Sequence, residues 1–333
     1  MSVGWVRRHG VAIVILGLAV VFPFVVSEFW VVQIGISSLW LAIVAMSLTF
    51  LASYGGMISL AQTALYGVAG YAMAILTVEN GVNPWLAILV ALLLTVAVGA
   101  VLGTVAARTY GIYFLMITLA YGVFAYYFAN QARQITGGHG GINGVLAPSI
   151  GGISLLDRTN LYFAALLAAV LCYLGLRYLV RTPFGIALQG VRDDPLRMSA
   201  LGFNVPLYRI LAFVAGAFVA GVGGVFAVWY NVRISPGSID LTRTVDVLVV
   251  SVIGGLYRLE GAFVGAVAFT LLSNYANEFT DRYNMLIGVI FLVVLLLSPG
   301  GLLGMWEQFV RRFRTFVTRL KTRDGGREAR EKG

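Results

Sequence analysis

The chain has 333 residues, of which 59% are hydrophobic and only 11% are charged. An ordinary soluble domain has about 25% charged residues, so this composition excludes a typical soluble protein. The apolar runs are about 20 residues long and do not alternate, which favours membrane-spanning helices over a membrane barrel. The 40 glycines fit this class, because small residues let helices approach closely in lipid. We therefore predict an all-α polytopic membrane protein.

The apolar runs predict about ten transmembrane helices, within a range of eight to ten. The first run could be a signal peptide, but it continues through Pro23 without a clear cleavage site, so we interpret it as a retained helix. The eighth and ninth runs are short and could instead form a re-entrant pair or half-helices. The predicted helices are 11–27, 30–52, 61–78, 84–107, 111–130, 160–180, 207–231, 245–256, 261–276 and 284–304.

Basic residues gather in three places, and these predict the orientation. They lie near the N-terminus, in the polar stretch 181–209, and in the tail 307–333. Ten helices place all three on one side, so parity and charge agree. We predict that both termini and the segment 182–206 are cytoplasmic, and that residues 1–306 form the transmembrane domain. The tail carries most of the net charge of +9, which indicates topology and attraction to anionic lipid rather than nucleic-acid binding.

The stretch 181–209 contains the signature of a short helix. Asp194 is a suitable N-cap, and Pro195 falls at the first helical position, where its missing N–H costs nothing. Gly202 supplies a left-handed stop. The implied helix, 195–201, has about two turns and needs something to pack on. Its apolar face is too small for lipid binding alone, so we predict that it docks into a groove of a partner.

Two segments read Gly-Gly-x-x-x-Leu, at 55–60 and 254–259, and each links two predicted helices on the cytoplasmic side. They indicate either an internal repeat, as many transporters have, or two unrelated tight turns. A third Gly-rich run, at 136–144, could hold an anion with its backbone N–H groups. No phosphate-binding ATPase motif occurs in the chain, so we favour a structural or docking role for this run.

The sequence shows no catalytic or metal-binding constellation. It has one cysteine, Cys172, and two histidines, and neither a zinc-protease motif nor a nucleophile elbow occurs. The pairs Arg243–Asp246 and Arg258–Glu260 lie at helix ends, where an interfacial ion pair is the simplest interpretation. An ion-coupled carrier normally keeps an acidic residue deep in its bundle. These absences argue against an enzyme and against an ion-coupled carrier, which remains the alternative class of transporter.

A series of short segments along the chain has a recognisable order and spacing. They are 58–62 with 66–72, 118–121, 136–138 with Gly141, 182–185 with 192–194 and 200–202, 212–214 with 220–224, 235–236, 254–256 with Gly261, Gly265 and Ala266, and 298–302. Each is weak alone, but together they resemble the permease subunits of branched-chain amino acid ABC importers, of the leucine/isoleucine/valine M type. The resemblance covers about residues 35 to 305.

The resemblance implies a type II ABC importer-like permease in the inner membrane of a bacterium. A second, similar permease would pair with it, two ABC ATPase subunits would dock inside, and a periplasmic solute-binding protein would deliver solute. ATP and Mg would bind the ATPase subunits, and no cofactor is expected on this chain. By position, the segment that couples to the ATPases comprises Arg192, Asp193, Asp194, Pro195, Leu196, Ala200, Leu201 and Gly202. Leu196 and Ala200 share one helix face.

Departures from the family pattern leave the solute open. Pro195 stands where the family often has Glu or another helix former, Ala61 replaces a usual glycine, and Gln62 replaces a common histidine. The segment 256–260 is also more charged than usual. The resemblance implies import of branched-chain amino acids or similar small polar solutes, while close relatives carry urea, short amides, or aromatic or dicarboxylic acids. Candidate pathway residues, each with helix packing as the alternative, are Ser59, Gln62, Tyr66, Thr118, Tyr121, Asn130 and Asn274.

Overall fold

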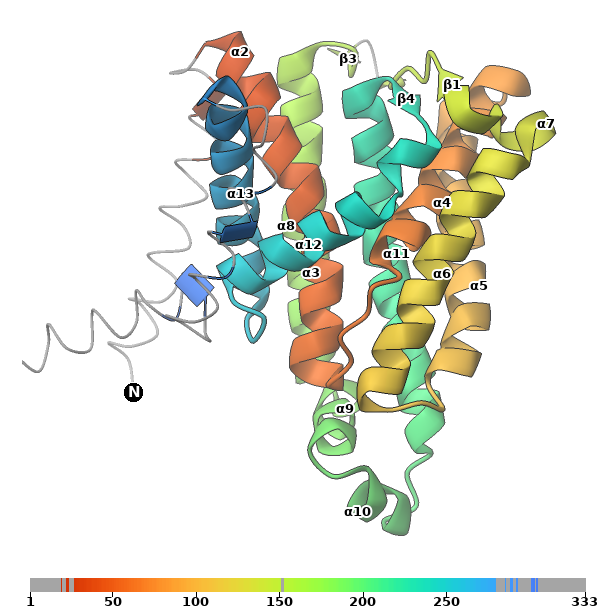
Figure 1. Ribbon diagram of the computed structural model, residues 1–333, viewed down its shortest axis with the longest axis vertical. Coiled ribbons are helices and arrows are strands. Elements are labelled where there is room, and N and C mark those ends of the chain that lie inside the picture. The colour runs from red at the N-terminus through yellow and green to blue at the C-terminus, as the bar shows by residue number, and fades with distance from the viewer. Residues whose placement is uncertain are drawn as a thin grey trace, which may run out of the picture.

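The computed structural model describes residues 27–150 and 153–279, together with the single positions 19, 22, 23, 285, 288, 289, 292, 301, 302 and 304. Within this part, long helices run along one axis, with short strands and turns at one end and two short helices at the other (Figure 1). The predicted helices 11–27 and 284–304 lie almost wholly outside the described residues, and the basic tail 307–333 lies entirely outside them.

Six helices of the described part are long and apolar enough to cross a membrane. Five of the predicted helices agree with them to within a few residues, and a sixth, 261–276, is longer than predicted. They are Val31–Gly55 (π-helical η1, Val31–Ile36, continuing into α3, Ser37–Gly55), α5 (Pro84–Ala106), α6 (Gly111–Gln131), α8 (Arg158–Arg181), α11 (Val205–Asn231) and α13 (Leu259–Phe279). The described residues support a polytopic helical membrane protein but do not establish a count of ten helices.

The helix α12 (Leu241–Gly254) is too short to cross a membrane alone. Its 14 residues span about 20 Å at 1.5 Å per residue, against a hydrocarbon core of about 30 Å. By contrast, α4 (Gln62–Ala74) continues directly into the π-helical turn η2 (Ile75–Glu79), and together they agree with the predicted helix 61–78. An extended segment runs from the end of α3 to the start of α4, about halfway up the bundle (Figure 1).

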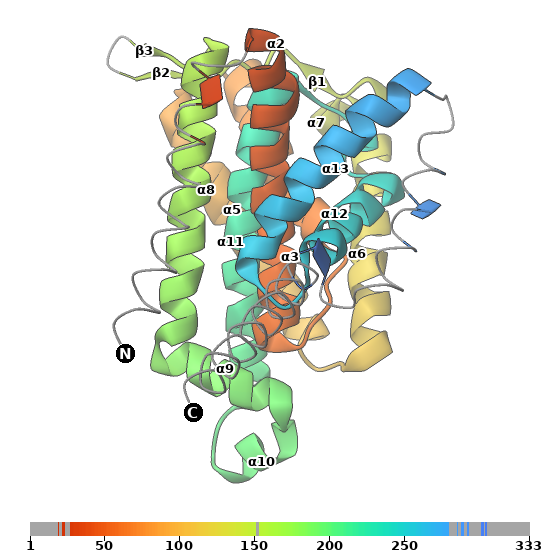
Figure 2. The same ribbon diagram turned by 90° about the vertical axis from the view of Figure 1, so that its left-hand side faces the viewer.

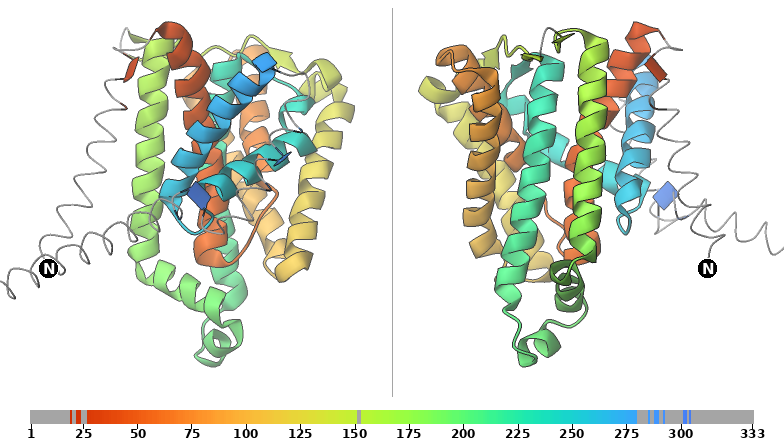
Figure 3. Two further views of the ribbon diagram at one scale, coloured as in Figure 1. Left: turned by 60° about the vertical axis from the view of Figure 1, so that its left-hand side comes forward. Right: turned by 180° about the vertical axis from the view of Figure 1, so that it is seen from behind.

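The run 245–256 is therefore a half-helix, one of the two possibilities that the sequence left open. The run 261–276, predicted to be short as well, belongs to α13, which has 21 residues. The two helices pack side by side and meet at the turn between them (Figures 2 and 3). The pair is thus one half-helix followed by one full-length helix.

The helix α3 lies at the centre of the bundle and is buried along most of its length. α11, α13, α12 and α8 all pack against it. Glycines make the closest of these contacts possible. A Cβ atom at Gly223 would collide with Val44 of α3, and one at Gly224 would collide with the backbone of Tyr66 in α4. Close helix approach through small residues is the usual means of packing in lipid, where apolar side chains gain little from leaving the solvent.

The end of the bundle opposite α10 carries the irregular segments. β1 (Ile142–Asn143) pairs antiparallel with β4 (Arg233–Ile234), and β2 (Ser149–Ile150) pairs antiparallel with β3 (Ile153–Ser154). The Gly-rich run lies beside them, since Gly141 has a φ of +65° and approaches the backbone of Ile234 too closely for a side chain. The other short elements here are α2 (Glu28–Trp30), α7 (Arg133–Thr136), η3 (Gly138–Gly140) and η4 (Pro236–Ser238).

The crossing of α12 and α13 depends on backbone contact at Gly265, where a Cβ atom would collide with Val250 and Gly254. We expect Gly265→Ala to destabilise the protein by about 1–3 kcal/mol, the usual cost of overpacking. Gly175→Ala in α8 is the matched control, because nothing lies within 4 Å of the added methyl group. Thermal unfolding of both variants in detergent measures the difference. Equal midpoints would show that the crossing opens without strain.

Candidate functional site

Two short helices extend the bundle beyond the end of α8 (Figure 2). α9 (Pro183–Asp193) begins at Thr182, whose hydroxyl accepts a hydrogen bond from the amide of Gly185. α10 (Pro195–Ala200) begins at Asp194, whose carboxylate accepts from the amide of Arg197 at 3.0 Å. The chain leaves α10 through Gly202, with φ of +89°. The predicted cap, first residue and stop of the short helix are confirmed, whereas α9 was not predicted.

The short helix α10 presents apolar side chains to the outside. Leu196 is 84% exposed and Leu201 is 66% exposed, and Ala200 is exposed as well. Met198 is half-buried and packs over Gly190 of α9, where a Cβ atom would lie 2.8 Å from its sulfur. The helix is therefore held on α9 from one side, and the described residues leave Leu196 and Leu201 uncovered.

Arg192 joins α9 to the centre of the bundle. One guanidinium nitrogen lies 2.7 Å from a carboxylate oxygen of Asp193, and another donates to the carbonyl of Ser53 near the end of α3. Its aliphatic stem lies over Gly56, the left-handed residue that ends α3. The hydroxyl of Ser53 donates in turn to the carbonyl of Leu256, at 2.7 Å. The two Gly-Gly-x-x-x-Leu segments thus meet beside α9, whether or not they derive from a repeat.

Three predicted pathway residues lie together at the unwound segment 56–61. The Thr118 hydroxyl of α6 accepts from the amide of Leu60 at 3.1 Å, and the Ser59 hydroxyl accepts from the amide of Ala61 at 3.3 Å. The side-chain carbonyl of Gln62 accepts from the Ser47 hydroxyl at 2.8 Å. All three predicted residues are buried; Thr118 and Ser59 satisfy backbone amides inside the bundle, whereas Gln62 contacts the Ser47 side chain.

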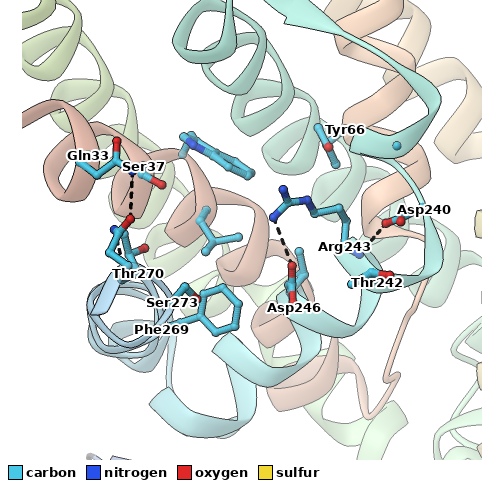
Figure 4. A pocket seen from close by; sticks show the side chains of 15 residues that line it. Gln33, Ser37, Tyr66, Asp240, Thr242, Arg243, Asp246, Phe269, Thr270 and Ser273 are labelled. Atoms are coloured by element: carbon cyan, nitrogen blue, oxygen red, sulfur yellow. Dashed lines mark hydrogen bonds and ion pairs between the residues drawn. The ribbon is translucent and has the colours of Figure 1, made fainter. Parts of the chain in front are cut away.

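A pocket of about 390 Å³ opens between η1, α3, α4, α12 and α13 (Figure 4). Tyr66 and Asn274, two further predicted pathway residues, belong to its wall. The Tyr66 hydroxyl donates to the carbonyl of Ser238, and the Asn274 carbonyl accepts from the Gln33 amide at 2.9 Å. The pocket is lined by Gln33, Ser37, Trp40, Leu41, Tyr66, Gly237, Asp240, Thr242, Arg243, Asp246, Val247, Phe269, Thr270, Ser273 and Asn274.

The pocket contains charges of both signs. Arg243 lies 3.3 Å from a carboxylate oxygen of Asp246, one turn further along α12. Asp240 caps this helix by accepting from the amide of Arg243 at 2.8 Å. The sequence prediction set Arg243 and Asp246 aside as an interfacial pair because it began the helix at residue 245. The sequence did contain a signal for this pocket. Arg243 and Asp246 are opposite charges three residues apart, in a chain with few charged residues.

The remaining two predicted pathway residues do not line this pocket. Tyr121 lies on α6, and its hydroxyl donates to the carbonyl of Leu102 at 3.2 Å. Asn130 is half-buried near the end of the same helix. The seven predicted pathway residues therefore lie in three places: at the unwound segment, in the pocket wall, and on α6.

Known proteins are similar to this chain over most of its length. Residues 30–297 match the family described as "Branched-chain amino acid transport system / permease component". The LivM high-affinity branched-chain amino acid permease protein of Escherichia coli is 25% identical over 90% of this chain and 76% of its own length. The probable LivH branched-chain amino acid permease protein of Methanocaldococcus jannaschii is 25% identical over 49% of this chain and 54% of its own length.

The NupQ guanosine ABC transporter permease protein of Bacillus subtilis is 22% identical over 47% of this chain and 52% of its own length. No solved structure matches. The family match covers well over half of the chain and includes the unwound segment, α9, α10 and the pocket. This multi-pass membrane protein therefore belongs to the family of permease components of branched-chain amino acid transport systems.

Proposed function

We propose that this chain is a permease subunit of a binding-protein-dependent ABC importer that moves branched-chain amino acids or similar small polar solutes into the cell. The observation that carries the proposal is α10, a capped helix that projects beyond the bundle with Leu196 almost fully exposed. A two-turn helix gains little stability of its own, so an uncovered apolar face on it favours contact with another protein. The partners at this end are two ABC ATPase subunits.

Charge supports the proposed orientation, with α10 in the cytoplasm of a bacterial cell and the chain in its inner membrane. The α10 end carries an excess of arginines over acids, as cytoplasmic loops do. Its arginines are Arg108, Arg177, Arg181, Arg192, Arg197, Arg209 and Arg258, against Asp193, Asp194 and Glu260. The strand end has an even balance, with Arg133, Arg158 and Arg233 beside Glu28, Glu79 and Asp157. With the ten helices predicted from the sequence, both termini also lie in the cytoplasm.

The energy for transport comes from ATP hydrolysis on the partner subunits. Closure of the ATPase pair moves α10, and α9 moves with it. Arg192 passes this motion to the end of α3 and, through Ser53, to the turn between α12 and α13. These elements flank the unwound segment and the pocket. A second, similar permease subunit completes the pathway, since the pocket opens at the side of the bundle and Arg243 is half exposed there.

An amino acid is the proposed solute because the relatives that cover most of the chain are named for amino acid transport. A periplasmic solute-binding protein delivers it to the strand end. The guanosine permease covers less than half of the chain, so we rank nucleosides below amino acids. Urea, short amides, and aromatic or dicarboxylic acids are further candidate solutes that rank below amino acids.

The double variant Leu196→Asp/Ala200→Asp tests the contact with the ATPases. The double change places two carboxylates in an apolar contact, which costs about 2 kcal/mol when that contact is a hot spot of the interface, so we expect association to weaken about thirtyfold. Co-purification with the ATPase subunits and solute-stimulated ATP hydrolysis measure the effect. Leu156→Asp is the matched control, because Leu156 is similarly apolar and 54% exposed but lies at the strand end. Intact association and stimulation in the double variant would refute the docking role.

Arg192→Ala tests the link between α9 and α3. The variant loses a charge-assisted hydrogen bond to Ser53, worth about 1 kcal/mol at a partly exposed position. Hydrogen exchange over residues 183–203 should then become about fivefold faster. Arg108→Ala, at an exposed arginine of the same end, should leave the exchange of this segment unchanged. If both variants exchange like the native protein, α9 is held by its apolar face alone.

A further inference from the structure

We propose that the pocket between α3, α12 and α13 binds the charged headgroup of an α-amino acid, with Arg243 contacting its carboxylate and Asp246 contacting its ammonium group. The inference rests on the proposed function and names the class of solute that this site takes. Arg243 and Asp246, interpreted from the sequence as an interfacial ion pair, are thus assigned to the solute.

The spacing of the two charges fits a zwitterion. In an α-amino acid the carboxylate and the ammonium group are bonded to the same carbon, so a complementary site needs opposite charges side by side. Arg243 and Asp246 lie one helical turn apart and approach to 3.3 Å (Figure 4). Their contact uses one nitrogen of the guanidinium and one oxygen of the carboxylate. Within the described residues, the other oxygen of Asp246 and the second terminal nitrogen of Arg243 take no part in this contact, so they can serve a ligand.

Three residues of the pocket wall also carry unpaired polar atoms. The indole nitrogen of Trp40 and the hydroxyls of Thr270 and Ser273 are buried without a hydrogen-bond partner among the described residues. Most buried polar groups in folded proteins have a partner. These atoms are buried in the wall and not exposed to the cavity, so the charged pair carries the inference.

The pocket also has an apolar wall. Leu41, Val247 and Phe269 line it beside the charged pair. A site that combines opposite charges with an apolar wall matches an amino acid with an apolar side chain. The volume of about 390 Å³ lies near the lower end of the range of small-molecule sites, roughly 300–1,000 Å³. The space therefore suits a small solute.

The charges discriminate against the remaining solute classes. Urea and short amides carry no charge and would leave Arg243 and Asp246 without ionic partners. A dicarboxylic acid would bring two negative charges toward Asp240 and Asp246, with only Arg243 to balance them. Juxtaposed like charges oppose binding, and this repulsion is a common basis of specificity. The pocket thus selects solutes with one charge of each sign.

The test uses the membrane complex of this chain, its partner permease and the ATPases, before the binding protein is added. Binding of radiolabelled leucine is measured with unlabelled competitors. Isoamylamine has only the ammonium group, 4-methylpentanoate has only the carboxylate, and urea has neither. We expect leucine and isoleucine to compete at least tenfold better than any of the three. Equal competition by a singly charged or neutral compound would overturn the proposal without requiring any variant.

Two near-isosteric variants locate the binding. Arg243→Gln and Asp246→Asn should each weaken leucine binding by at least about tenfold, because each removes a charge-assisted hydrogen bond. Arg233→Gln is the matched control, since Arg233 is exposed on β4 and does not line the pocket. Co-purification of each variant with the ATPase subunits reports an assembled complex, and basal ATP hydrolysis should stay unchanged in Arg233→Gln.

The same preparation separates this inference from the proposed function. After the binding protein is added, ATP-driven leucine uptake is measured in proteoliposomes. Uptake that is equal in wild type, Arg243→Gln and Asp246→Asn would overturn the pocket assignment while leaving the importer intact. A chain that neither associates with ATPases nor supports ATP-driven uptake of any solute would overturn both. Loss of binding and uptake in the two pocket variants alone would support both.

Discussion

The structure depends on one constraint, that backbone groups inside a membrane must find partners within the protein. The chain leaves the helix at Gly56 and does not resume it until Gln62, deep in the bundle. The exposed backbone is satisfied locally, by Leu51 for the amide of Met57 and by Thr118 for the amide of Leu60. Such a segment is stable only if other helices surround it. This explains why α3 lies at the centre and why α11 presents glycines to its neighbours.

The same break in the helix brings α4 and the half-helix α12 together. The hydroxyls of Thr63 in α4 and Thr244 in α12 lie 2.6 Å apart, and a second contact joins Ser53 to the turn after α12. α12 is thus held near both its ends by the α3–α4 region. Because Arg192 of α9 bonds to Ser53, the polar contacts run from the projecting helices to the half-helix that carries the charged pair. Interrupted helices of this kind are a common way for transporters to build a solute site at mid-membrane.

Much of this architecture could be predicted from the sequence, and the exceptions have physical reasons. Long apolar runs identify helices such as α5 and α11, because a helix that crosses the hydrocarbon core needs apolar side chains along its whole length. The helix at Pro195 was predictable since its cap and its stop are local. The extent of α13 was underestimated because polar residues at its two ends, Glu260 and Asn277, lower the hydropathy there. The pocket was missed because it is formed by residues far apart in the chain, and pathway candidates were sought only among uncharged polar residues.

The charged pair in α12 shows what a hydropathy pattern conceals. Asp246 has only 15% of its side chain exposed and lies on α12, which packs against the apolar helices α3 and α13. Removing a carboxylate from water costs several kcal/mol, and a single partner rarely recovers all of it. An interfacial pair would avoid this cost by turning outward to water. Here Asp246 lies in the wall of the pocket, and only Arg243 beside it is half exposed. In the proposed site, a zwitterionic solute gives Asp246 a second partner of opposite charge.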